Sequence, residues 1–254
     1  MEYTDTHTHL YDEAFAQDID QVVSRAVAGG VRTMLLPCED SASFPAQRAL
    51  QARYPACFRV MAGVHPTSLT AENLEAELDF VERELARGGC VAVGEIGMDL
   101  YWDRTYERQQ RQAFDRQLEL AQRYDLPVSI HCREAMEPTL EILESHPGVR
   151  GAMHCFNGSL REARRVLDAG LVLGVGGTIT YKNNPLTDVL RETGYRHIVL
   201  ETDAPFLAPV PHRGRRNESA YIPEIAAFLA GLFGTDIGEI ARAAQQNAER
   251  VFGL

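Results

Sequence analysis

The segment Tyr3-Thr4-Asp5-Thr6-His7-Thr8-His9-Leu10, residues 3–10, stands before the first stretch with helical periodicity. Within it, Asp5, His7 and His9 alternate with threonines. In an extended strand, residues two apart point to the same face, so an acid and two imidazoles converge on one side. Two interpretations are open from this segment alone: the polar outer face of a half-exposed strand, or the first part of a metal site.

Short β-branched and apolar runs alternate with amphipathic stretches along the rest of the chain, which is the pattern of a parallel sheet with crossover helices. The predicted strands cover residues 2–6, 31–37, 58–62, 90–94, 127–130, 150–153, 171–174 and 198–200. The predicted helices cover residues 18–28, 43–53, 74–87, 106–124, 136–144, 160–169, 185–192, 222–233 and 236–252. Glycines at 29–30, 88–89 and 170 stand where helices should end.

The initial segment also decides between two folds. Eight strand–helix units in 254 residues fit a TIM, or (β/α)8, barrel in count and in length. A doubly wound open sheet is the alternative, but that fold normally carries a glycine-rich fingerprint directly after its first strand. Residues 7–9 have the sequence His-Thr-His instead. We therefore expect an α/β protein with one barrel domain over residues 1–254 and an extra C-terminal helix.

Composition narrows the class of protein. No apolar run approaches the ~18 residues that a membrane span needs, and no basic and apolar leader opens the chain. The five cysteines are scattered without a CxxC pair, which is typical of reduced thiols in a cytoplasmic protein. The net charge of −11 argues against a broad basic surface for nucleic acid. It leaves a polyanionic substrate open, because metal-binding carboxylates count as negative in this sum.

Metal-type ligands follow the predicted strands at their C-terminal ends, which form the catalytic rim of TIM barrels. These residues are His7, His9, His65, Glu95, His131, His154, Glu201 and Asp203. A single histidine at a strand end is weak evidence, because histidines are often partly buried for structural reasons. So many ligands at one end of different strands indicate a shared site. His146 and His197 lie outside this pattern, and we interpret both as structural.

Imidazoles and carboxylates together suit divalent zinc, manganese, iron, nickel or magnesium. The set exceeds the ligands that one zinc ion needs, so we expect two ions, which can activate a shared water and hold the oxygens of a phosphodiester. Glu95 is expected to bridge the ions, and Asp203 to bind metal and accept the proton of the attacking water. Glu201 is either a further ligand or the partner of one. Asp5 is expected to orient the first two histidines.

Donors for a phosphate lie on the same rim. Arg133, two residues beyond the histidine of the fifth strand, could pair with phosphate through two hydrogen bonds. The glycine-rich stretch 174–178 follows the seventh strand, where backbone N–H groups often hold phosphate. Lys182, the only lysine, comes shortly after it.

Two further segments could contact a substrate, and His65 is a further candidate for such a contact. The dense basic stretch 212–217, which includes Arg213 and Asn217, follows the last predicted metal ligand; the alternative is a solvated loop. Tyr101 and Trp102 follow Glu95 and could stack on a terminal base, since base stacking tolerates any sequence. Packing in the core is the alternative for this single tryptophan.

Six segments resemble, in order, the signature blocks of the TatD-type metal-dependent deoxyribonucleases, a branch of the amidohydrolase barrels. They are residues 4–10 (TDTHTHL), 94–99 (GEIGMD), 131–133 (HCR), 154–158 (HCFNG), 201–205 (ETDAP) and 211–214 (PHRG). The resemblance implies a TIM barrel that holds two or three divalent ions, with zinc, manganese, magnesium and nickel all open. It also implies cleavage of DNA, expected as a 3′-to-5′ exonuclease.

By this resemblance the metal ligands would be six residues, with Glu201 and His65 implicated in some members. The six are His7, His9, Glu95, His131, His154 and Asp203. Met98 stands where the family usually has leucine, and Leu100 where an aromatic residue is common. Neither is expected to touch a metal.

Three functions remain open at this point. The first is a metal-dependent phosphodiesterase acting on DNA, or on RNA. The second is an amidohydrolase that opens a C–N or ester bond, such as a deaminase, a lactonase or a D-aminoacyl-tRNA deacylase. The third, a non-catalytic scaffold, would show lost ligands, and none is lost. Arg133, Lys182 and the arginines of 213–216 favour the first, with nucleic acid as substrate and no membrane or obligate protein partner.

Overall fold

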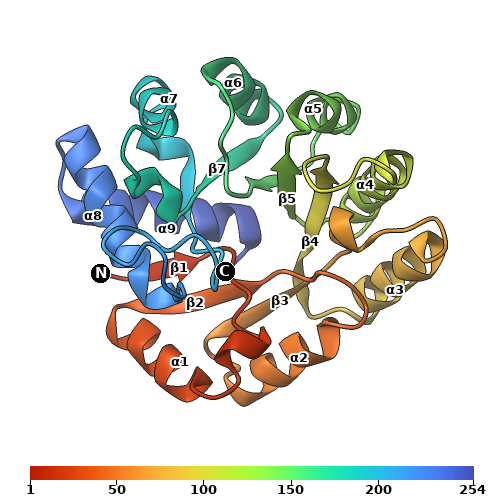
Figure 1. Ribbon diagram of the computed structural model, residues 1–254, viewed down its shortest axis with the longest axis horizontal. Coiled ribbons are helices and arrows are strands. Elements are labelled where there is room, and N and C mark those ends of the chain that lie inside the picture. Colours follow the sequence, from red (N-terminus) through yellow and green to blue (C-terminus); the bar gives the residue numbers. More distant parts are fainter.

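The computed structural model describes residues 1–254, and its parallel strands are ringed by helices (Figure 1). The strands are β1 (Tyr3–Asp5), β2 (Val31–Leu36), β3 (Phe58–Ala62), β4 (Cys90–Asp99), β5 (Val128–Arg133), β6 (Gly151–Met153), β7 (Leu171–Val175) and β8 (Ile198–Leu200). Each strand pairs in parallel with the next one in the chain. The N–H group of Thr6 donates to the carbonyl of Leu200 at 3.0 Å, which links β8 back to β1. The predicted barrel fold is confirmed.

All the predicted helices are present, each beginning and ending within one residue of its prediction. They are α1 (Ile19–Ala28), α2 (Phe44–Arg53), α3 (Leu74–Arg87), α4 (Glu107–Arg123), α5 (Met136–Glu144), α6 (Leu160–Asp168), α7 (Leu186–Thr193), α8 (Ile222–Phe233) and α9 (Ile237–Phe252). Short 3₁₀ turns lie at Glu13–Phe15, Pro66–Ser68, Gly177–Thr180, Tyr195–His197 and Ser219–Tyr221. Local signals set several ends: Ser159 and Glu162 form a capping box at α6, and Gly234 ends α8 with a left-handed φ of 63°.

The additional helix α9 packs at the start of the strands. A buried cluster joins side chains of six strands to the end of this helix: Leu35, Met61, Ala92, Ala152, Val172 and Val199 with Ala248, Val251 and Phe252. The amide of Asn247 donates to the carbonyls of Arg196 and Ile198, where β8 begins. A larger cluster fills the space between the strands and the outer helices. The C-terminal ends of the strands are therefore left for the site.

Strand β4 is longer than predicted. It continues past residue 94 to Asp99, and its pairing with β5 skips one residue: Gly94 lies opposite Ser129, but Ile96 lies opposite Ile130. Glu95 is the extra residue of this irregularity, a β-bulge that redirects a side chain. The sequence Gly-Glu-Ile-Gly lacks the alternation of an ordinary strand, which is why this extension was missed.

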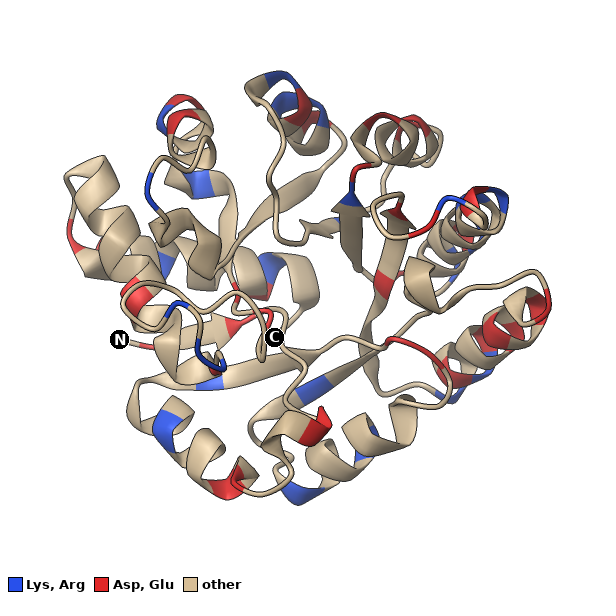
Figure 2. Ribbon diagram, in the orientation of Figure 1, with Lys and Arg blue, Asp and Glu red and all other residues tan.

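No single helix is both long and apolar enough to cross a membrane. By length and composition, only the bent pair formed by residues 219–233 and 237–252 reaches that threshold, and its two helices pack on each other and on the strands. Basic and acidic residues are interspersed around the outer helices, without a continuous basic face in this view (Figure 2).

Candidate metal centre

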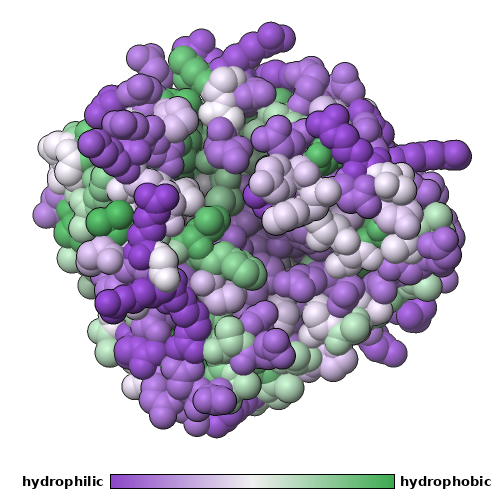
Figure 3. Space-filling model, in the orientation of Figure 1, coloured by the Kyte–Doolittle hydropathy of each residue, from purple (hydrophilic) through white to green (hydrophobic).

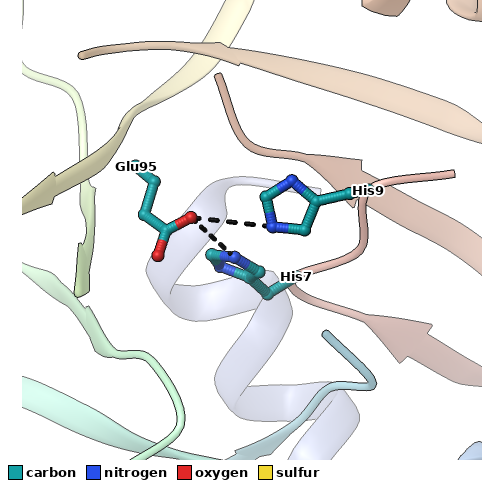
Figure 4. Close-up of side chains that lie close together, drawn as sticks. All are labelled: His7, His9 and Glu95. Atoms are coloured by element: carbon teal, nitrogen blue, oxygen red, sulfur yellow. Dashed lines mark ion pairs between the residues drawn. The ribbon is translucent and has the colours of Figure 1, made fainter. Parts of the chain in front are cut away.

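The C-terminal ends of the strands bring the predicted metal-type ligands together. His7 and His9 follow β1, His65 follows β3, Glu95 lies in β4, His131 in β5, His154 follows β6, and Glu201 and Asp203 follow β8. Figure 4 shows His7 and His9 turned towards the carboxylate of Glu95. Residues that lie far apart in the sequence thus form one polar cluster on a single rim of the barrel.

Glu95 lies at the middle of this cluster, and only 3% of its side chain is exposed. Its Oε2 lies 3.1 Å from Nε2 of His7 and 3.7 Å from Nε2 of His9. Its Oε1 lies 2.9 Å from Nδ1 of His131 and 3.6 Å from Nε2 of His65. The two oxygens therefore face different pairs of imidazoles, which is the arrangement that a bridging carboxylate needs.

Asp203 faces the same cluster from the other side. Its Oδ1 lies 3.4 Å from Nε2 of His9, 3.7 Å from Nε2 of His154 and 3.9 Å from Nε2 of His7. The backbone N–H of Asp203 donates to the carbonyl of His7 at 2.9 Å, and its φ is 57°, a left-handed conformation that aspartate tolerates better than most residues. Its side chain is 16% exposed, so solvent reaches this carboxylate.

Hydrogen bonds on the outer side of two rings determine which nitrogen faces the cluster. Nδ1 of His7 lies 3.0 Å from the hydroxyl of Ser129. Nδ1 of His9 lies 2.9 Å from the hydroxyl of Tyr11, which donates its own proton to the carbonyl of Pro37. The Tyr11 oxygen must therefore accept from Nδ1–H of His9, which leaves Nε2 as the nitrogen that faces the carboxylates and would bind an ion.

His154 has an acidic partner behind its ring, within ion-pair distance but without a hydrogen bond. Its Nε2 faces the cluster, while its Nδ1 lies 2.9 Å from Oε1 of Glu201. That carboxylate also accepts the N–H of Cys155 at 2.6 Å and is 1% exposed. Glu201 is thus buried behind the ring as its partner. A Cβ added at Gly174 would lie 2.4 Å from Oε2 of Glu201, so glycine in β7 leaves the space for this carboxylate.

Gly174→Ala is expected to displace Glu201 without disrupting the barrel, because the atom in conflict is the end of a side chain. We expect metal affinity to fall about 10–100-fold, as for loss of other ligand partners, and stability to fall by about 1–3 kcal/mol. Zinc titration and thermal melting measure both. Gly176→Ala is the matched control, since its nearest contact, 3.6 Å, is ordinary. Equal zinc affinity in the two variants would contradict the role of Glu201.

His65 differs from these histidines in the ring nitrogen that carries the proton. Its Nδ1 accepts the N–H of Thr67 at 3.2 Å and lies 2.6 Å from the Thr67 hydroxyl. In the neutral ring the proton is therefore on Nε2, which faces Glu95 at 3.6 Å. A protonated nitrogen donates a hydrogen bond and cannot bind metal, so this geometry favours contact with substrate over metal ligation.

One buried nitrogen supports the interpretation of the cluster as a metal site. Nε2 of His7 is fully buried and makes no hydrogen bond, although Glu95 and Asp203 lie close to it. An unsatisfied buried polar atom costs ~1–3 kcal/mol, and a cation among these groups removes that cost. Four groups have ligand-type atoms within 4.8 Å of one another: His7–His9–Glu95, His7–His154–Asp203, His65–Glu95–His131 and His154–Cys155–Glu201. In the third group, His65 would bind an ion only if the proton on its Nε2 moved. The residues present fit divalent ions, and Glu95 belongs to two of the groups.

Acids and imidazoles in the cluster shift one another's pKa values against the effect of burial. Burial alone would raise the pKa of Glu95, but His7, His65 and His131 hold it well below its usual value. Burial alone would lower the pKa of His9, but Asp203, Glu39 and Glu95 raise it to about 10. Because ions must displace protons from such imidazoles, ion binding should strengthen as the pH rises.

Two acidic residues at the cluster were not predicted. Oδ2 of Asp99 accepts a hydrogen bond from Nε2 of His131 at 2.9 Å, and Oε1 of Glu39 lies 3.2 Å from Nδ1 of His9. Asp99 is four residues beyond Glu95, so an extended β4 would have placed both on one face. Glu39 follows β2, whose C-terminal end had no assigned residue.

Several of the predicted substrate contacts are exposed or partly exposed at the rim. Arg133 lies on the rim with its guanidinium carbon 3.8 Å from the ring centre of Tyr101 and 5.1 Å from that of Trp102. Trp102 is 70% exposed, so the alternative of core packing was wrong. Arg213 is exposed and stacks on Tyr181 at 4.3 Å. Lys182 is exposed in the neighbouring loop.

Two residues of the basic stretch 212–217 have structural positions. Asn217, expected to contact substrate, is fully buried and donates to the carbonyls of Thr202 and Phe206 at 2.8 and 2.7 Å. The guanidinium of Arg216 is paired with Asp18 at the start of α1.

Asp5, expected to orient imidazoles, contacts no ring of the cluster. Its carboxylate accepts hydrogen bonds from the hydroxyls of Thr202 and Ser219, both at 2.6 Å, and from the backbone N–H of His7 at 3.3 Å. It therefore fixes the backbone where β1 meets β8.

Comparison with known proteins gives a consistent result. A family model described as "TatD related DNase" matches residues 4–253. The chain is 34% identical to the "Uncharacterized metal-dependent hydrolase YabD" of Bacillus subtilis, with 98% of each chain covered. It is 35% identical to the "3'-5' ssDNA/RNA exonuclease TatD" of Pantoea ananatis, covering 98% of this chain and 99% of that one. The crystal structure of YjjV, a TatD homolog from Escherichia coli, superposes with a TM-score of 0.92 at 32% identity, covering 99% and 98% of the two chains.

Proposed function

Because the chain belongs to the family of TatD-related DNases and is a metal-dependent hydrolase, we propose that it hydrolyses phosphodiester bonds of DNA. More specifically, we propose that it is a 3′-to-5′ exonuclease that prefers single strands. Support comes from a relative, matched over 99% of its length, whose name states this activity, and from cationic and aromatic side chains at the rim of the centre.

We propose that two divalent ions would be held by His7, His9, Glu95, His131, His154 and Asp203, with Glu95 as the carboxylate that both would share. Support for two comes from Glu95, whose two oxygens face different imidazoles. When bound, such ions lower the pKa of a water and stabilise charge on the oxygens of a phosphodiester. A third ion would need a further group, such as His154, Cys155 and Glu201.

The residues of the chain supply proton transfer and orientation. Asp203 is the proposed acceptor of the proton of the attacking water. It is the more exposed of the two carboxylates among the proposed ligands, and its pKa is lowered, despite burial, by His9, His154 and His7. His65 is the proposed donor to an oxygen of the substrate, because its Nε2 carries the proton. Glu201 keeps His154 in the orientation that faces the cluster.

The main support for a nucleic-acid substrate is the pair of arginine–aromatic stacks at the rim. Arg133 stacks over Tyr101, with Trp102 beside it. This places a hydrogen-bond donor for phosphate and exposed aromatic rings side by side. Arg213 over Tyr181 repeats this chemistry after β7 and β8. Unstacked bases bind aromatic rings while arginines bind the backbone, which is how single strands are held without sequence preference.

Apolar side chains complete the rim. Phe206, Leu207 and Val210 in the loop after β8 are exposed, and the ring of Phe206 lies 6.3 Å from that of His9. Figure 3 shows a hollow near the middle of this face with apolar side chains beside it. An uncharged surface next to the reacting centre suits the base of a terminal nucleotide better than a paired duplex.

An endpoint assay tests the proposal. Purified protein, with Mn²⁺ or Zn²⁺ added, is incubated with single- and double-stranded oligonucleotides labelled at the 3′ end, and separately with an aminoacyl-tRNA. We expect early release of the labelled 5′-mononucleotide from the single strand, and loss of this activity after chelation. Deacylation of the tRNA without cleavage of either oligonucleotide would reject the phosphodiesterase in favour of an ester hydrolase.

Arg133→Ala is expected to lower kcat/KM on a phosphodiester by about 10–100-fold, since a charge-assisted hydrogen bond contributes ~1.5–3 kcal/mol. A smaller loss is expected on an uncharged ester, if both are hydrolysed. Arg191→Ala on the outer helix α7 is the control, because that exposed arginine pairs only with Asp188. Equal losses on the two substrates would contradict phosphate binding by Arg133.

We propose that the protein acts in the cytoplasm, as its thiols suggest. All five cysteines are free, and none is paired in a disulfide. The substrate would then be DNA, or RNA, of the same compartment.

A further inference from the structure

The carboxylate of Asp99 contacts the metal centre, and the proposed function assigns it no role. Asp99 ends β4 and is 1% exposed. Its Oδ2 accepts a hydrogen bond from Nε2 of His131 at 2.9 Å. Its Oδ1 accepts the backbone N–H of Tyr101 at 3.0 Å and that of Trp102 at 3.4 Å. One buried carboxylate thus joins a ligand of the centre to the loop that carries the exposed aromatic rings.

The position of Asp99 is itself held on both sides. Its N–H donates to Oε1 of Gln110 in α4, and its carbonyl accepts from Nε2 of the same side chain, both at 2.9 Å. The next residue, Leu100, donates its N–H to the carbonyl of Arg133 at 2.9 Å. The carboxylate is therefore a rigid support that the surrounding backbone holds in place.

His131 is oriented differently from the other imidazoles of the cluster. His7, His9 and His154 turn Nε2 towards the carboxylates, whereas His131 turns Nδ1 towards Oε1 of Glu95 at 2.9 Å. A neutral imidazole carries one proton, and only the other nitrogen can bind a metal. Ionised carboxylates can only accept, and both Glu95 and Asp99 face this ring as acceptors. An ion that binds Nδ1 would displace the proton on that side, whereas Asp99 keeps the proton on Nε2.

We propose that Asp99 is a positioning residue with two tasks. Through Oδ2 it fixes the tautomer of His131 that can bind a divalent ion, and through Oδ1 it holds the loop of Tyr101 and Trp102 at the rim. The inference rests on the metal site of the proposed function and adds to it a link between metal binding and the substrate loop.

Asparagine at this position tests the inference because an amide has one acceptor and one donor. The N–H groups of Tyr101 and Trp102 require the oxygen, so the NH₂ group must face Nε2 of His131. That nitrogen then has to accept, which moves the ring proton to Nδ1, where it points into the centre. Asp99→Ala removes the support but imposes no tautomer. A purely structural role would make the asparagine variant the milder of the two.

The first measurement is calorimetric titration of the metal-free, full-length chain with Zn²⁺. For Asp99→Asn we expect the affinity of at least one ion to fall about 10–100-fold, as for other partners of ligating histidines, and to fall at least as far as in Asp99→Ala. Far-ultraviolet circular dichroism checks that both variants are folded. Zinc binding by Asp99→Asn equal to wild type, or stronger than by Asp99→Ala, would overturn the proposal.

The second measurement is made on the wild type, so it holds even if neither Asp99 variant folds. In Zn²⁺-saturated protein with ¹⁵N-labelled histidine, NMR should place the ring proton of His131 on Nε2. Its signals are assigned by their absence from His131→Ala. A proton on Nδ1 would overturn the proposal for Asp99 while leaving the metal site intact. A wild type that binds no Zn²⁺ or Mn²⁺ would overturn the metal site and the proposed function together.

Discussion

Glu95→Gln is expected to abolish measurable hydrolysis and to reduce the number of bound ions per chain, while the barrel remains folded. The glutamine has the shape of the glutamate but lacks the charge that faces four imidazoles within 3.7 Å. Loss of ~4 kcal/mol of transition-state stabilisation corresponds to a rate about 10³-fold lower. Elemental analysis of the dialysed protein and a turnover assay measure the two effects.

A matched carboxylate provides the control for this prediction. Glu134 is exposed at the end of β5, on the same rim but outside the cluster. Glu134→Gln should keep both its ions and its activity. If Glu95→Gln turned over substrate at the wild-type rate, or kept its full complement of ions, Glu95 would not be the bridging group.

The sequence predicted the barrel and the cluster because both depend on local features. Strand–helix alternation sets the order of a parallel barrel, and the C-terminal ends of its strands then meet on one rim. Polar residues placed at or just after the ends of strands, such as His7, His154 and Asp203, must therefore converge. No long-range contact has to be known for that step.

Features that depend on the pairing of particular strands were not predicted. The bulge at Glu95 exists because β4 and β5 differ in register, and it extends β4 as far as Asp99. The hydrogen bond from His131 to Asp99 joins residues that are adjacent only in this register. A sequence pattern with period two cannot show an extra residue in one strand.

Sequence patterns also could not predict which side chains are exposed to solvent. The basic stretch 212–217 was expected to face a substrate, yet Arg216 pairs with Asp18, almost two hundred residues away. In the same stretch Arg213 is exposed and Asn217 is buried. The loop after β8 folds back over the first helix, and only that tertiary contact decides which side chains remain available.

Gly97→Ala is expected to have the largest effect on stability of any single methyl group added to the rim. A Cβ at this position would lie 2.0 Å from the carbonyl oxygen of His131, and the φ of Gly97 is 133°, which disfavours any side chain. The conflict is with backbone of β5, so no side chain can move away to relieve it. Separation of β4 from β5 would also pull Glu95 from His131.

We expect Gly97→Ala to cost more than ~4 kcal/mol, equivalent to a melting temperature lower by more than about 8 °C, or to prevent folding. Gly231→Ala in α8 is the opposite case, because no atom lies within 4 Å of its added Cβ and its φ is not in the left-handed region. There alanine should stabilise the helix by about 0.5–1 kcal/mol. Thermal melting of both variants measures the contrast. If Gly97→Ala melted like the wild type, the close contact of β4 and β5 could not be what holds Glu95, Asp99 and His131 together.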